Sequence, residues 1–129
     1  MAPFVEIGDL LHIEKLAQNE LAYLYSAASC FVFASVGEGF GMPPCEAMKS
    51  GCPVALSDIG AHRYFAGDGA LFFSPYDEDS CTDAIRQIIS NSNLREDLIK
   101  KAHLSSSRFS SNSVKIMWEE LFQKLQKKN

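Results

Sequence analysis

Residues 30–57 read CFVFASVGEGFGMPPCEAMKSGCPVALS, a stretch in which two short apolar runs flank a glycine-rich loop and a helical segment. The runs at 30–35 and 53–57 are rich in aromatic and branched residues, as is typical of parallel strands covered on both faces. Between them, the proline pair at 43–44 suits the first turn of a helix, and Gly51 suits its end. The stretch therefore predicts a strand, a loop, a helix and a second strand.

The same alternation extends to both sides of this stretch. Upstream, the sequence predicts a strand near residues 11–16 and an amphipathic helix that Asn19 caps and that ends near Ser29. Downstream, it predicts a short helix at 61–66 and, after a Gly-Asp-Gly turn, a third strand at 70–74.

Three more helices are predicted towards the end of the chain. Acidic residues from Asp77 onwards lie in the first turn of one helix. Asn93 caps a second helix, which runs to about Ser105. The last helix follows Ser111, and an apolar stripe of this kind usually marks a buried face, which makes Trp118 a packing anchor. The stripe consists of Val114, Met117, Trp118, Leu121 and Leu125.

Strands that alternate with helices predict right-handed crossovers between parallel strands. The expected fold is α/β, a Rossmann-like parallel sheet with helices on both faces, in a single domain that spans residues 1–129. Ligands of such sheets bind beyond the carboxyl ends of the strands. The loop at 38–41 lies there, between the strand that ends near Ser35 and the helix that begins near Met42.

Composition excludes several classes of function. A hydrophobic content of 47% in 129 residues is ordinary for one globular domain, and a net charge of −4 argues against a nucleic-acid partner. The four cysteines follow no zinc or redox spacing and are expected to be reduced and buried. His12, His62 and His103 form no metal-ligand pattern, so structural or solvent-facing roles are expected, with helix capping for His62. Without a leader or a membrane-spanning stretch, the chain is expected to be cytoplasmic.

The loop that follows the first strand carries the residues of a candidate site. Gly39 and Gly41 let the backbone approach a ligand closely, and the N-terminus of the following helix favours a phosphate. Glu38 and Glu46 lie eight residues apart on either side of that position, where carboxylates accept hydrogen bonds from sugar hydroxyls. The pattern indicates a nucleotide sugar. The alternative is that Glu46 is a solvated helix residue and the glycines form an ordinary turn.

A family resemblance strengthens the first interpretation. The stretch SVGEGFGMPPCEAMKSGCPVALSDIGAHRYFAGDGALFFSP, residues 35–75, resembles the C-terminal donor-binding half of the retaining GT-B glycosyltransferases of the group 1 type. The E-x7-E signature of that family falls on Glu38 and Glu46. Residues 19–28 resemble the preceding helix of the family, and residues 108–110 its approach to the terminal helix.

The resemblance implies a role for each residue of the loop. Glu38, the candidate catalytic residue, would hydrogen-bond the transferred sugar as a positioning group, and Glu46 would bind the ribose. The backbones of Gly39, Phe40 and Gly41 would meet the sugar and diphosphate, with Met42 completing the donor-binding set. Transfer with retention and without a metal or other cofactor is implied, the leaving diphosphate being stabilised by N–H groups and basic side chains.

The substrates implied are a nucleoside-diphosphate sugar of the GDP-mannose or UDP-glucose type and a glycan or lipid-linked acceptor. Envelope polysaccharide synthesis is the expected setting, with peripheral membrane association of the full-length enzyme. The acceptor would bind through an N-terminal domain that is missing here.

The chain departs from the family pattern in its basic residues. The Arg and Lys that neutralise the diphosphate normally lie well upstream of the signature, and Lys15 is the sole basic residue before Glu38. The chain is therefore expected to be a fragment that does not catalyse transfer alone and whose terminal helix promotes self-association. Two alternatives stay open: another GT-B enzyme, such as a sugar-nucleotide epimerase or a glycan phosphorylase, or a non-catalytic nucleotide-binding or partner-docking module.

Overall fold

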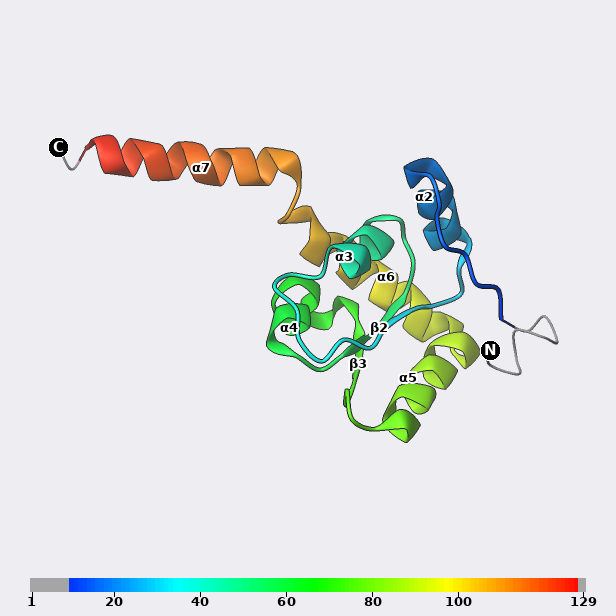
Figure 1. Cartoon of the computed structure of the whole chain (residues 1–129). Helices are drawn as coiled ribbons and strands as arrows, with labels where there is room; N and C mark the ends of the chain where they lie inside the picture. Colours follow the sequence, from blue (N-terminus) through cyan, green and yellow to red (C-terminus); the bar gives the residue numbers. More distant parts are fainter. Residues whose placement is uncertain (1–9, 128–129) are drawn as a thin grey trace.

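The structure is a computed structural model that describes residues 10–127. Helices and strands alternate through most of this range (Figure 1). Their order is α2 (Gln18–Ala27), β1 (Phe31–Phe33), α3 (Met42–Lys49), β2 (Val54–Ser57), α4 (Gly60–Ala66), the 3-10 turn η1 (Gly67–Gly69), β3 (Leu71–Phe73), α5 (Glu78–Ser90), α6 (Ser92–Ser107) and α7 (Ser111–Gln126).

The sheet has three parallel strands in the order β1-β2-β3, which confirms the predicted parallel arrangement. The central strand β2 is fully buried, and its side chains alternate between two hydrophobic clusters. Val54 and Leu56 pack with side chains of α3 and α4, whereas Ala55 packs with Ala84 and Ile88 of α5. Helices therefore cover both faces of the sheet, as predicted.

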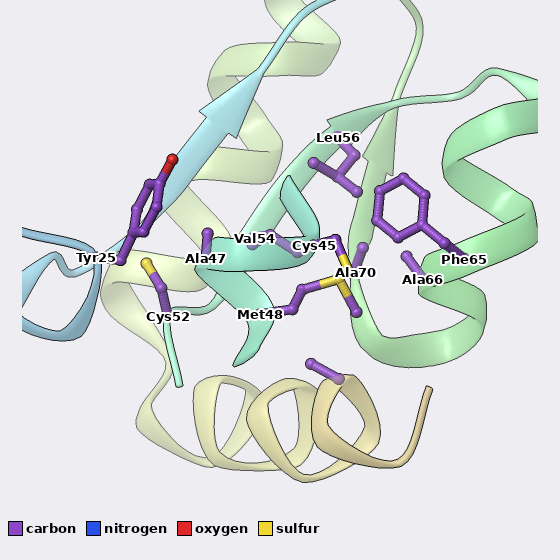
Figure 2. Packing of buried hydrophobic residues seen from close by; sticks show 11 residues of the cluster. Tyr25, Cys45, Ala47, Met48, Cys52, Val54, Leu56, Phe65, Ala66 and Ala70 are labelled. Atoms are coloured by element: carbon purple, nitrogen blue, oxygen red, sulfur yellow. The ribbon is translucent and has the colours of Figure 1, made fainter. Parts of the chain in front are cut away.

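The larger cluster lies directly under α3, the helix that follows the glycine-rich loop. Figure 2 shows Cys45, Ala47 and Met48 of α3 facing this core, with Phe65 of α4 beside them. Cysteine serves here as a small apolar residue, and burial raises the pKa of the Cys52 thiol to about 11, which keeps it protonated. All four cysteines are free thiols. Cys45 and Cys52 are buried as predicted, whereas Cys30 and Cys81 are only half-buried, contrary to the prediction.

The predicted strand at 11–16 is wrong, because residues 11–17 form no strand and β1 pairs only with β2 among the described residues. Leu11 is 80% exposed, so the short apolar pattern there has no sheet to pack against. The helix that follows begins at Gln18 rather than being capped by Asn19. The Glu20 carboxylate accepts the N–H of Ala17 over 2.7 Å and holds that first turn.

The caps of the later helices differ from the prediction. Asp77, expected in the first turn of α5, is its N-cap and accepts the N–H of Ser80 over 3.1 Å. The cap of α6 is Asn91 and not Asn93, since the Asn91 side chain accepts the N–H of Leu94 over 3.0 Å. Because α6 starts two residues earlier than predicted, it has about half a turn more before Leu98, its first buried apolar residue.

Helix α7 projects away from the rest of the chain (Figure 1). Ser110 caps it, and within residues 10–127 nothing covers its apolar stripe, none of whose side chains is buried. Trp118 is 55% exposed and stacks only on Phe122 of the same helix, with ring centroids 5.8 Å apart. The helix was predicted correctly, but the packing role of Trp118 is not fulfilled inside the described chain.

Candidate functional site

The glycine-rich loop lies where the sequence predicted it, between the carboxyl end of β1 and the start of α3. Gly41 is the N-cap of α3 and has a φ of +91°, a left-handed conformation that favours glycine. A Cβ atom on Gly41 would lie 3.0 Å from Cε1 of Phe65, so the position is closed to larger residues on its inner side. A Cβ atom on Gly39 would have no atom within 4 Å, which leaves open space for a ligand on that part of the loop.

Four consecutive backbone N–H groups of the loop are unpaired. Within residues 10–127, those of Gly39, Phe40, Gly41 and Met42 donate to no protein acceptor. Consecutive free amides around a left-handed residue form a concavity that binds anions. The loop can therefore receive a phosphate group.

Helix α3 offers a ligand fewer backbone N–H donors than expected from the sequence. The second and third residues of α3 are Pro43 and Pro44, which have no N–H, and the N–H of Cys45 already donates to the Gly41 carbonyl over 3.4 Å. Only the N–H of Met42 remains in the first turn. The anion-binding capacity thus belongs to the loop amides more than to the helix, a distinction that follows from the proline pair.

The two carboxylates of the signature lie in different surroundings. Glu38 is exposed on the loop, whereas Glu46 is half-buried on α3. Glu46 lines a groove of about 210 Å³ between α2 and α3, together with Tyr25 and Lys49. Burial raises the pKa of the Tyr25 hydroxyl, and the negative charge of Glu46 raises it further. Glu38 does not line this groove, so the binding of one nucleotide sugar by both carboxylates stays a prediction.

Phe40 holds the loop from inside. Its ring packs against Phe65 of α4, with centroids 5.5 Å apart, and edge-on against Phe109, at 5.1 Å. Phe109 lies in the turn before α7, and its carbonyl oxygen accepts a hydrogen bond of 3.3 Å from Nζ of Lys49. The Phe40 side chain thus anchors the loop and leaves the loop backbone accessible to a ligand. The Met42 side chain is 60% exposed at the mouth of the site.

An ion pair lies at the carboxyl end of β2. Arg63 makes two hydrogen bonds to Asp58, of 2.6 and 2.7 Å, and these bonds hold the pKa of the Asp58 carboxyl below its ordinary value. The Arg63 guanidinium also lies 4.2 Å from the centroid of the Phe72 ring. This arginine is therefore held in place by its neighbours rather than extended towards the loop.

Sequence reasoning missed the role of His62 in this site. His62 was expected to cap a helix, but its side chain is fully buried beneath Gly41 and bonds to the end of β2. Isolated histidines carry no spacing signal, so only the path of the chain could bring it under the loop. No cluster of three or more His, Cys, Asp or Glu able to hold a metal occurs in the described range, and no helix there is long and apolar enough to span a membrane.

Comparisons with known proteins agree with this geometry. The family model of glycosyl transferases group 1 matches residues 8–104. The chain is 45% identical over 76 residues to the O-antigen chain mannosyltransferase RfbU of Salmonella typhimurium, a match covering 59% of this chain and 22% of that protein. It is 33% identical over 103 residues to O-antigen chain mannosyltransferase B of Escherichia coli, covering 80% and 27% of the two chains.

The fold has a close counterpart among solved structures. The sucrose-phosphate synthase of Thermosynechococcus elongatus superposes with a TM-score of 0.83 at 25% identity, over 96% of this chain and 32% of that one. The chain thus spans 22%, 27% and 32% of the length of these three proteins. The family match over most of the residues, together with the parallel sheet and its glycine-rich loop, shows that this chain belongs to the group 1 glycosyltransferases of the GT-B type.

Proposed function

We propose that this chain is the donor-binding part of a retaining glycosyltransferase that uses a nucleoside-diphosphate sugar. The observation that carries the proposal is the row of four unpaired N–H groups on the loop between Glu38 and the start of α3. Phosphate oxygens of the donor accept from N–H groups of this row, and no metal or other cofactor is required for that contact. The leaving diphosphate gains the same stabilisation as the glycosidic bond breaks.

The donor is proposed to be GDP-mannose, with UDP-glucose as the alternative. Two of the relatives are named as O-antigen chain mannosyltransferases, which supports a mannosyl donor and an envelope-polysaccharide acceptor, whether a glycan or a lipid-linked one. The acceptor binds through a separate N-terminal domain, and the full-length protein works in the cytoplasm at the inner membrane face. Basic groups from elsewhere in the full-length protein are proposed to help balance the diphosphate, because Arg63 is bonded to Asp58.

The test is calorimetric titration of the 129-residue chain with GDP, UDP and ADP and with their sugar conjugates. Binding of one nucleoside diphosphate, in preference to the others, supports a donor site and names the base. A chain that binds none of them contradicts donor binding by this chain, and the longer protein then shows whether the missing domain restores it. Equal binding of inorganic phosphate argues for an unspecific anion site.

Replacing Glu46 by alanine is expected to weaken nucleotide binding about 10- to 150-fold, as the loss of a charged hydrogen-bond acceptor worth about 1.5–3 kcal/mol predicts. The variant should fold normally, because Glu46 is only half-buried and its side chain is not part of the core. The measurement is the same titration, with Glu96→Ala, an exposed glutamate of α6 outside the groove, as the matched control. Unchanged affinity in Glu46→Ala would defeat the ribose assignment.

Glu38→Ala is expected to weaken the binding of two ligands to different extents. If Glu38 contacts the transferred sugar, the variant loses affinity for the intact sugar nucleotide by about 10-fold or more and little for the bare nucleoside diphosphate. Its side chain is exposed, so stability should not change. Equal losses for the two ligands would contradict the assigned role.

The isolated chain is proposed to self-associate through α7. Its apolar stripe is open to water along the whole helix, and burying such a stripe against a second copy removes that surface from solvent. Trp118→Lys should shift the chain towards the monomer in sedimentation equilibrium. Ile116→Lys, on the opposite face of the helix, should not, and a wild-type chain that is monomeric at high concentration refutes the proposal.

A further inference from the structure

His62 is buried directly beneath the glycine-rich loop. Its side chain is fully shielded from solvent, and the ring lies 3.5 to 3.6 Å from the place where a Cβ of Gly41 would be. The ring packs between two aromatic neighbours, Phe33 of β1 at 5.6 Å and Phe65 of α4 at 5.8 Å, measured between ring centroids. The imidazole is therefore held firmly on the inner side of the candidate site.

The hydrogen bonds around His62 determine which ring nitrogen carries the proton. Nδ1 lies 2.8 Å from the carbonyl oxygen of Ser57, which only accepts, so Nδ1 is the donor. The Ser57 hydroxyl lies 3.2 Å from Nδ1 and donates its own hydrogen to the carbonyl of Ser35, so it also acts as an acceptor towards the ring. The neutral imidazole consequently carries its hydrogen on Nδ1 and leaves Nε2 as a bare acceptor.

That acceptor has no partner. Nε2 of His62 is the buried side-chain atom without a hydrogen bond in residues 10–127. Buried polar atoms are nearly always hydrogen-bonded, so an unpaired one in the interior needs an explanation, and a partner that arrives in another state of the loop is one. An ideal Cβ on Gly41 would lie 3.6 Å from Nε2, so the Gly41 backbone is close to this atom, and the N–H of Gly41 is also unpaired within residues 10–127.

We propose that His62 is a positioning residue for the glycine-rich loop, and that its Nε2 accepts the N–H of Gly41 when the loop closes over a bound diphosphate. The bond turns the Gly41 peptide inward and leaves the N–H groups of Gly39, Phe40 and Met42 for the phosphate oxygens. The Ser35, Ser57 and His62 bonds then connect the carboxyl ends of β1 and β2 to the loop that binds the ligand. The choice of ligand rests on the proposed function, whereas the proton position and the support of the loop do not.

The first test is nuclear magnetic resonance of the nitrogen-15-labelled chain, with GDP and UDP as probes. Without nucleotide, the His62 ring should show the hydrogen on Nδ1, and its Nε2 should show an unprotonated signal. With nucleotide, Nε2 should shift as an acceptor does, and exchange of the Gly41 amide hydrogen should slow at least tenfold. A hydrogen on Nε2 in the free protein overturns the inference, and so does Gly41 exchange that stays unchanged while nucleotide binds.

Two variants of His62 distinguish a role in positioning the loop from a purely structural role in the core. His62→Asn keeps a donor towards the Ser57 carbonyl but removes Nε2, so it should retain most of the stability and lose at least tenfold in nucleotide affinity. His62→Phe keeps the ring beneath Gly41 without either nitrogen and should lose the same affinity. Ile88→Val, buried in the other hydrophobic cluster, is the matched control: it should lower stability and leave affinity unchanged.

The variants also decide the case in which wild type binds no nucleotide. That result would count against the proposed function alone. Inorganic pyrophosphate then serves as the probe: its addition should slow exchange of the Gly41 amide hydrogen in wild type and not in His62→Asn. Gly41 exchange that pyrophosphate does not slow in wild type, or slows equally in the two chains, would show that His62 only fills the core.

Discussion

Replacing Gly41 by alanine is expected to lower the free energy of unfolding by about 2–4 kcal/mol and to abolish nucleotide binding. A non-glycine residue at a φ of +91° costs about 1–3 kcal/mol, and forcing a methyl group into a filled space costs a similar amount. The new Cβ would lie 3.0 Å from the Phe65 ring, which is fully buried and has little room to move. The loop must then shift outward, which misplaces the four N–H groups.

Urea denaturation and nucleotide titration together measure this effect. Gly39→Ala is the matched control, because its Cβ meets no atom within 4 Å and its φ is not in the left-handed region. That variant should keep its stability to within about 1 kcal/mol and lose affinity only by blocking the approach of the ligand. A Gly41→Ala chain as stable as Gly39→Ala would show that the left-handed cap of α3 is not needed.

Gly69→Ala is expected to destabilise the chain at least as much, by about 3 kcal/mol or more. A Cβ on Gly69 would lie 2.5 Å from Cα and 2.6 Å from the backbone nitrogen of Ala102, so the 3-10 turn η1 rests directly on the backbone of α6. A backbone cannot rotate away as a side chain does, and the two elements must separate. The expected result is a large drop in the midpoint of thermal unfolding.

The control for Gly69 is another glycine of the described range. Gly60→Ala adds a methyl group that meets no atom within 4 Å, at the first residue of α4, and alanine favours a helix. It should leave stability unchanged or raise it slightly. If Gly69→Ala unfolds at the same temperature as Gly60→Ala, the close packing of η1 on α6 does not contribute to stability.

Local patterns in the sequence determined most of the architecture. The apolar runs before and after the loop, the proline pair and the glycines that follow the helices each act within a few residues, so β1, α3, β2 and the later helices were predictable. The same holds for the glycine-rich loop, whose place after β1 follows from chain order alone. Boundaries that depend on a choice between nearby caps, such as Asn91 and Asn93, were not predictable, because both residues are equally able to cap.

The tertiary structure alone decided which residues that are distant in the sequence contact one another. The alternation of β2 between two clusters, the inward anchoring of Phe40 on Phe109 and the burial of His62 under Gly41 join residues far apart in the sequence, and no short pattern records such contacts. The exposure of α7 is of the same kind, since an apolar stripe predicts a buried face without saying what covers it. The sequence by itself determined the elements and the signature of the candidate site, whereas long-range packing decided how that site is supported.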